Sequence, residues 1–140
     1  MASISSKKRK RTRRGEAILE VAIALPLLLI VTTGIIEYGW LFMKLSHATN
    51  AARAGARVGA RADGTLAQVN TTIQNAMALG NMQLNTHYTT PGLSNPALLT
   101  PGASYTVTVR INYAAVGLHM PLIPVPANID AKMVMAREGP

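Results

Sequence analysis

The side chains able to do acid–base or nucleophilic chemistry are few and scattered in this 140-residue chain. It has six acids, three histidines and no cysteine, so thiol catalysis, a zinc ribbon and a disulfide framework are excluded. The acids and histidines are Glu16, Glu20, Glu37, His47, Asp63, His87, His119, Asp130 and Glu138. They include no paired carboxylates at a spacing usable for catalysis, and the chain has no phosphate-binding loop. We therefore predict a protein that is not an enzyme and has no metal, no cofactor and no small-molecule substrate.

One of the acids, Glu20, stands inside the most apolar segment of the chain. Residues 21–36 carry no charge, and residues 17–36 supply the mainly apolar stretch of about 20 residues that a membrane-spanning helix needs. The alternative is a buried helix of a soluble domain, but so short a chain has too little else to surround a helix that is apolar on all sides. An acid near the hydrocarbon boundary is costly unless paired. Glu20 is therefore a candidate functional residue, unless it lies in the cytoplasmic headgroup layer.

A second acid, Glu37, marks the other end of this segment. Three aromatic residues follow it closely: Tyr38, Trp40 and Phe42. Aromatic side chains are enriched where a membrane meets water, so this end of the segment is typical of the outer interface of a retained helix. We expect Glu37 either to lie in that interface or to act in assembly.

A basic tail precedes the apolar segment. The first 14 residues hold seven of the 14 basic side chains and no acid, whereas the rest of the chain carries seven basic and six acidic side chains. The positive-inside bias then places the N-terminus in the cytoplasm and the C-terminal part outside. Two alternatives are weaker: a nucleic-acid-binding arm needs a soluble body, and a secretory signal needs a cleavage site that is missing directly after residue 36.

A strip of small residues follows the aromatic group. Ala51, Gly55 and Gly59 repeat every four residues, so on a helix they form a face with almost no side-chain bulk. Another helix can approach such a face closely. Two partners fit this helix-packing strip, a neighbouring subunit or the rest of the same chain. Beside it, arginines at 53, 57 and 61 form a row of like charges that an acidic partner or solvent must offset.

The hydrophobic periodicity predicts an α+β fold in which a long transmembrane helix extends into an outer helix and is followed by a small domain of one helix and antiparallel strands. The expected elements are helices at 17–62 and 65–79 and strands at 84–89, 105–113 and 129–138, with Asp63 or Thr65 capping the second helix. Pro26 favours a bend in the first helix. We divide the chain into a basic leader (1–15), the transmembrane and extended helix (16–62) and the outer domain (63–140).

Four blocks of the N-terminal part resemble a known family. These are RRGEAILE at 13–20, LPLLL at 25–29, GIIEYGWLF at 34–42 and NAARAGAR at 50–57. In this order and spacing they are similar to the TadE-like pseudopilins, or minor pilins, of tight-adherence pilus systems, which are related to type IV pili. The resemblance covers about residues 13–61.

This resemblance implies a function in pilus assembly at the bacterial inner membrane, with no nucleic acid partner. It implies that a prepilin peptidase cuts between Gly15 and Glu16 and that other pilins or pseudopilins and pilus assembly proteins are the partners. The new amine of Glu16 on one subunit would then pair with Glu20 of its neighbour. Two alternatives stay open, an uncleaved single-pass assembly or adhesion factor and, more distantly, a basic nucleic-acid-binding protein.

Overall fold

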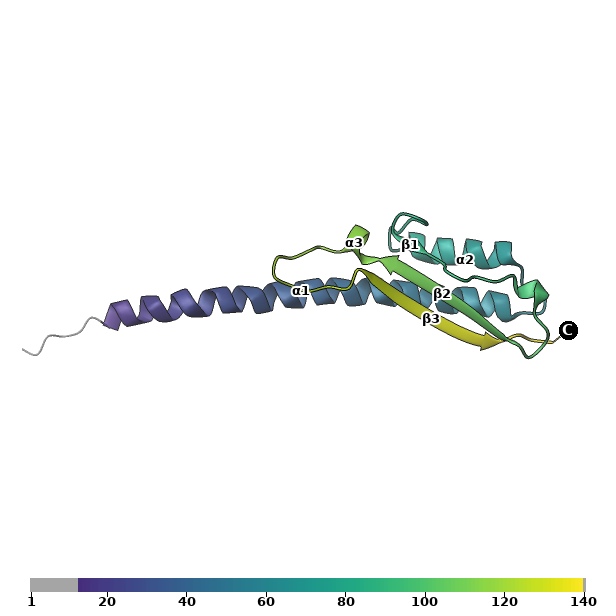
Figure 1. The fold of residues 1–140 in the computed structure, drawn as a ribbon, viewed down its shortest axis with the longest axis horizontal. Helices are drawn as coiled ribbons and strands as arrows, with labels where there is room; N and C mark the ends of the chain where they lie inside the picture. The colour runs from purple at the N-terminus through teal and green to yellow at the C-terminus, as the bar shows by residue number, and fades with distance from the viewer. Residues whose placement is uncertain (1–12, 140) are drawn as a thin grey trace, which may run out of the picture.

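The computed structural model describes residues 13–139, with side chains from residue 15 onward, and has the predicted α+β fold. One long helix runs the length of the molecule, and a shorter helix and a small sheet pack against its C-terminal half (Figure 1). The elements in chain order are α1 (Arg13–Ala60), α2 (Leu66–Ala78), β1 (Tyr88–Thr89), η1 (Pro96–Leu98), β2 (Ser104–Asn112), α3 (Tyr113–Val116) and β3 (Asn128–Ala136).

Helix α1 has a bare half and a covered half. Its 48 residues make a rod of roughly 70 Å, and every residue from 15 to 32 is exposed. Pro26 lies within the bare half and the helix continues through it without a break. The helix ends at Ala60, two residues before the predicted boundary.

Helix α2 begins at a well-defined cap. The hydroxyl of Thr65 accepts a hydrogen bond from the backbone N–H of Gln68 (3.3 Å), and the Gln68 side chain accepts one from the N–H of Thr65 (3.0 Å). This reciprocal pair satisfies two amide groups that a helix start leaves free. The buried residues of α2 are Val69, Ile73 and Met77, which lie on one face and pack towards α1.

The sheet is antiparallel, in the order β1-β2-β3. Strand β2 has the predicted alternation, because its side chains at 105, 107, 109 and 111 are fully buried and those between them are not. Strand β3 pairs with it along its whole length, with Val107 opposite Met133. Strand β1 has only two residues and is shorter than predicted, since Leu84 joins it only through a single bridge to Tyr88.

The core lies between the covered half of α1, helix α2 and the sheet. Four alanines of α1 belong to it: Ala48, Ala51, Ala52 and Ala56. The hydrophobic core therefore extends across the expected boundary at residue 62, and the second half of the long helix folds together with the outer domain. This arrangement leaves the first half of α1 projecting alone (Figure 1).

Candidate functional site

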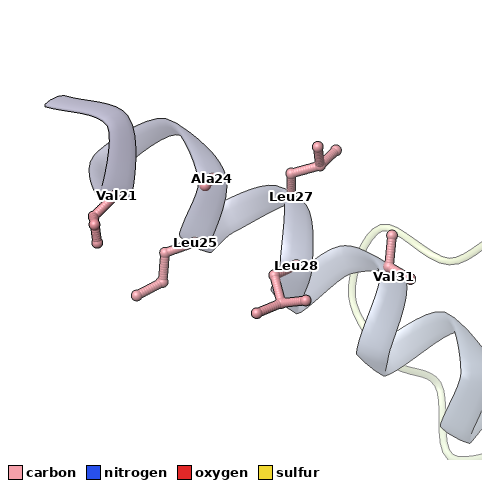
Figure 2. Close-up of a pocket in the computed structure, with 6 residues that line it drawn as sticks. All are labelled: Val21, Ala24, Leu25, Leu27, Leu28 and Val31. Carbon is pink, nitrogen blue, oxygen red and sulfur yellow. The ribbon is translucent and has the colours of Figure 1, made fainter. Parts of the chain in front are cut away.

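The bare half of α1 presents an apolar surface. Figure 2 shows side chains that stand off this helix into open space, and they line a shallow groove along it: Val21, Ala24, Leu25, Leu27, Leu28 and Val31. The helix is long and apolar enough to cross a membrane, and its most apolar stretch is entirely unburied in the chain. A soluble protein rarely exposes so large an apolar surface. The bare half therefore fits a membrane anchor.

Three of the residues predicted to take part in leader cleavage and assembly lie in the first turns of this half. Gly15, Glu16 and Glu20 are all helical and exposed. Glu16 and Glu20 are four residues apart and so share one face of the helix. An added Cβ at Gly15 would meet nothing within 4 Å among the residues that the structure describes.

Glu37 lies where the bare half ends, and its carboxylate is held inside the chain. The Tyr113 hydroxyl donates a hydrogen bond to Glu37 Oε1 (2.7 Å), and the backbone N–H of Met120 donates one to Oε2 (3.0 Å). Glu37 is fully covered within the chain, and both Tyr113 and Met120 contact its carboxylate. Burial raises the pKa of Tyr113 far above its usual range, and the hydrogen bond to the Glu37 carboxylate raises it further. We call Glu37, Tyr113 and Met120 the junction.

Two of the three aromatic residues expected at the membrane interface fasten the same segment to α1. Trp40 Nε1 donates a hydrogen bond to the carbonyl of Val116 (2.7 Å), and the Tyr38 hydroxyl donates one to the carbonyl of Pro124 (3.0 Å). Phe42 makes no such bond among the described residues and stays exposed. Residues 117–127, which connect α3 to β3, are therefore held along the helix at the end of its bare half.

The strip of small residues faces the rest of the same chain. A Cβ added at Gly55 would stand 2.7 Å from Ile73 Cγ1 of α2, and one added at Gly59 would stand 2.5 Å from Tyr105 Cδ1 of β2. Ala51 is completely buried as well. Of the two partners considered for the strip, the structure provides the intramolecular one. The arginine row beside it is exposed to solvent.

No arrangement of catalytic type appears among the described residues. The strongest ion pair there joins Arg110 to Asp130 across β2 and β3, with two contacts of 2.7 Å on the outer face of the sheet. The Arg110 guanidinium lowers the pKa of the Asp130 carboxyl. Residues 13–139 contain no group of three His, Cys, Asp or Glu side chains placed to hold a metal ion.

The sequence comparison assigns the N-terminal part. Residues 15–57 match the family model described as TadE-like protein. This part of the chain is TadE-like. The match confirms the predicted resemblance and associates the protein with Tad pilus systems. Comparison with curated proteins and with solved structures gives no match.

The TadE-like segment contains one side of the contacts made by Glu37 and Gly55. It begins at Gly15, includes the bare half of α1 and Glu37, and ends two residues before Gly59. The partners of Glu37 and Gly55, which are Tyr113 and Ile73, lie in the part of the chain outside the match. Sequence reasoning identified Glu37 and the strip but missed the partners, because no local spacing connects positions that are 76 residues apart.

Proposed function

We propose that this protein is a non-enzymatic pseudopilin or minor pilin that anchors in the bacterial inner membrane and takes part in assembling a tight-adherence pilus. The observation that carries the proposal is the coincidence of the TadE-like match with the bare apolar half of α1. The N-terminus is cytoplasmic in this proposal, since seven basic residues precede the apolar segment, and the outer domain lies on the opposite side. Its partners are a prepilin peptidase, other pilins or pseudopilins and pilus assembly proteins.

Maturation in this proposal removes residues 1–15. Glycine in a helix costs about 1 kcal/mol relative to alanine, so the turn around Gly15 opens more easily than the turns after it. A peptidase needs an extended, unobstructed backbone at the bond it cuts, and among the side chains that the structure describes none comes within 4 Å of a Cβ added at Gly15. Cleavage also removes half of the basic residues of the chain and leaves a mature protein with a charge of +1 from its side chains, seven basic minus six acidic.

Assembly in this proposal uses Glu20 and Glu37 in different ways. Glu20 is exposed on the bare half, so its carboxylate is available to the free amine of Glu16 on a neighbouring subunit. Both carboxylate oxygens of Glu37 already accept hydrogen bonds within the chain. Glu37 therefore serves assembly indirectly, by fixing the outer domain to the end of the membrane segment.

The test is N-terminal sequencing and intact-mass measurement of the protein extracted from membranes, with and without a co-expressed prepilin peptidase. We expect the peptidase to shorten the chain by residues 1–15, and we expect Gly15→Ala to block this shortening. Gly39→Ala is the matched control, because Gly39 is another uncrowded helical glycine of α1. An intact chain in the membrane would favour the uncleaved anchored factor instead. A soluble protein with salt-dependent DNA binding would favour the nucleic-acid-binding alternative.

A further inference from the structure

We propose that the loop of residues 117–127, between α3 and β3, enters the outer lipid interface beside α1 and forms a second contact of the protein with the membrane. The inference rests on the proposed membrane anchoring by α1. Figure 1 shows that this loop is the part of the outer domain that reaches furthest along α1 towards its bare half. We refer to it as the membrane loop.

Three contacts place the membrane loop at the end of the apolar segment. Met120 binds Glu37, Pro124 binds Tyr38, and Ile123 Cδ1 would lie 3.5 Å from a Cβ added at Gly34. If the hydrocarbon region is filled by residues 17–36, about 30 Å of helix, then Gly34 lies about 3 Å inside its outer edge. The tip of the loop therefore lies level with the lipid boundary, where interfacial protein segments are typically buried about 5–10 Å deep.

The composition of the membrane loop suits this position. Its sequence, GLHMPLIPVPA, has no Lys, Arg, Asp or Glu, and His119 is its only titratable side chain. Leu118 and Leu122 are 41% and 80% exposed. A loop in water is normally polar, whereas an uncharged apolar loop next to a membrane span loses no charge solvation when it meets lipid.

Leu122 makes the strongest case. Its backbone has φ 69°, a left-handed conformation that is an outlier for a bulky residue. The side chain in this conformation is exposed and not buried in the core. Strained positions that gain no packing within the fold are candidates for a contact outside it. Lipid at this level supplies an apolar contact for the side chain.

Lipid is the occupant we infer, because the contacts with Gly34, Glu37 and Tyr38 hold the loop level with the end of the apolar segment. Glu37 follows the last residue of the apolar segment, and an unpaired carboxylate at that level would be costly. The loop donates the Met120 N–H to Glu37, while Leu118 and Leu122 on either side of this residue stay exposed. This arrangement continues the apolar surface of α1 past the acid.

The absence of cysteine from the chain allows a direct test. Single-cysteine variants Leu122→Cys, Leu28→Cys and Leu98→Cys of the full chain are labelled with an environment-sensitive fluorophore and reconstituted in phosphatidylcholine and phosphatidylglycerol vesicles. Position 28 reports on the anchor. Position 98 reports on the aqueous side. Leu98 is 82% exposed and lies in η1. Arg137 donates hydrogen bonds to the carbonyl of Pro96 in η1 and to that of Ala62, just after the far end of α1. Quenching by lipid-bound nitroxides and by aqueous iodide is then compared.

We expect the label at 122 to lose most of its emission to nitroxides near the headgroups and the label at 98 to lose it only to iodide. If position 122 behaves like position 98 while position 28 is quenched by lipid, the membrane loop inference is wrong and the anchor stands. If position 28 is also unprotected, the anchoring proposal fails with it. If the response at 122 disappears when the protein is diluted in excess lipid, a second copy covers the loop and the inference is overturned.

Discussion

The substitution Gly59→Ala tests whether the strip of small residues packs within the chain. Gly59 lies on the buried face of α1, and an alanine Cβ there would stand 2.5 Å from Tyr105 Cδ1 and closer still to Cε1. Tyr105 is fully buried and its hydroxyl donates a hydrogen bond to the carbonyl of Ser94 (3.2 Å), so the ring cannot move aside freely. The new methyl group therefore forces β2 away from α1.

The magnitude follows from two opposing effects. Overpacking a core costs about 1–3 kcal/mol, and a clash with a tethered aromatic ring belongs near the upper end of that range. The higher helix propensity of alanine offsets about 1 kcal/mol of this loss of stability. We therefore expect Gly59→Ala to lower the free energy of unfolding of the outer domain by about 1–2 kcal/mol. Gly39→Ala, where an added Cβ meets nothing, should raise it slightly, so the difference between the two variants measures the clash.

The assay is urea unfolding of the full chain in detergent micelles, followed by the fluorescence of the single tryptophan. Trp40 reports on the outer domain because its indole is bonded to the carbonyl of Val116. Gly55→Ala should fall between the two other variants, since its added Cβ would stand 2.7 Å from Ile73 Cγ1, a less severe approach than the one at Gly59. If Gly59→Ala unfolds at the same urea concentration as the wild type or higher, the packing argument is refuted. A loss of crosslinks between subunits without a loss of stability would assign the strip to a partner.

Three further predictions concern charged groups. Tyr113→Phe removes one hydrogen-bond donor from the covered carboxylate of Glu37 and should lower the free energy of unfolding of the outer domain by about 1–2 kcal/mol. The measurement is the same urea unfolding assay, and an unchanged midpoint would show that water replaces the hydroxyl. Glu20→Gln should leave insertion and leader cleavage intact but reduce the protein in sheared surface filaments relative to the inner membrane; equal amounts in filaments would place Glu20 in the headgroup layer. Asp130→Asn should be slightly less stable than the wild type at pH 7, because the pair with Arg110 lowers the pKa of Asp130. The difference in stability between the two proteins should vanish as the pH falls below the ordinary carboxyl pKa of about 3.9 and then through the lowered pKa of Asp130 in the folded state. A difference in stability that persists in acid would contradict the ion-pair explanation.

The elements of this fold were predictable where one periodicity dominates. The alternation of β2 and the spacing of Val69, Ile73 and Met77 in α2 both appear in the structure as buried faces. Strand β1 was overestimated because the segment before it is rich in turn-forming residues, and Asn85 takes a left-handed conformation there. The elements could be read from local patterns because each buries its own apolar face.

For the candidate site, the sequence predicted one residue of each contact but not its partner. Glu37 stood out as an acid at the end of an apolar segment, but its donors come from Tyr113 and Met120, and nothing in their sequence context marks them as partners of an acid. The strip around Gly55 was recognisable by its lack of bulk, yet a face without bulk fits a helix of a neighbour as well as Ile73 of the same chain. A local sequence pattern shows that a surface is suited to a contact, whereas the residue that makes the contact depends on the tertiary fold.

The continuity of α1 has a mechanical consequence. Because the bare half and the covered half are one helix, a pull on the outer domain is transmitted to the bare half through the continuous ladder of backbone hydrogen bonds, several of which run in parallel in each turn. The ladder lacks one of these bonds at Pro26, which has no N–H to donate to the carbonyl of Ala22. Under tension the helix should therefore lengthen first around this turn, while the tightly packed contacts of Gly55 and Gly59 keep the outer domain folded.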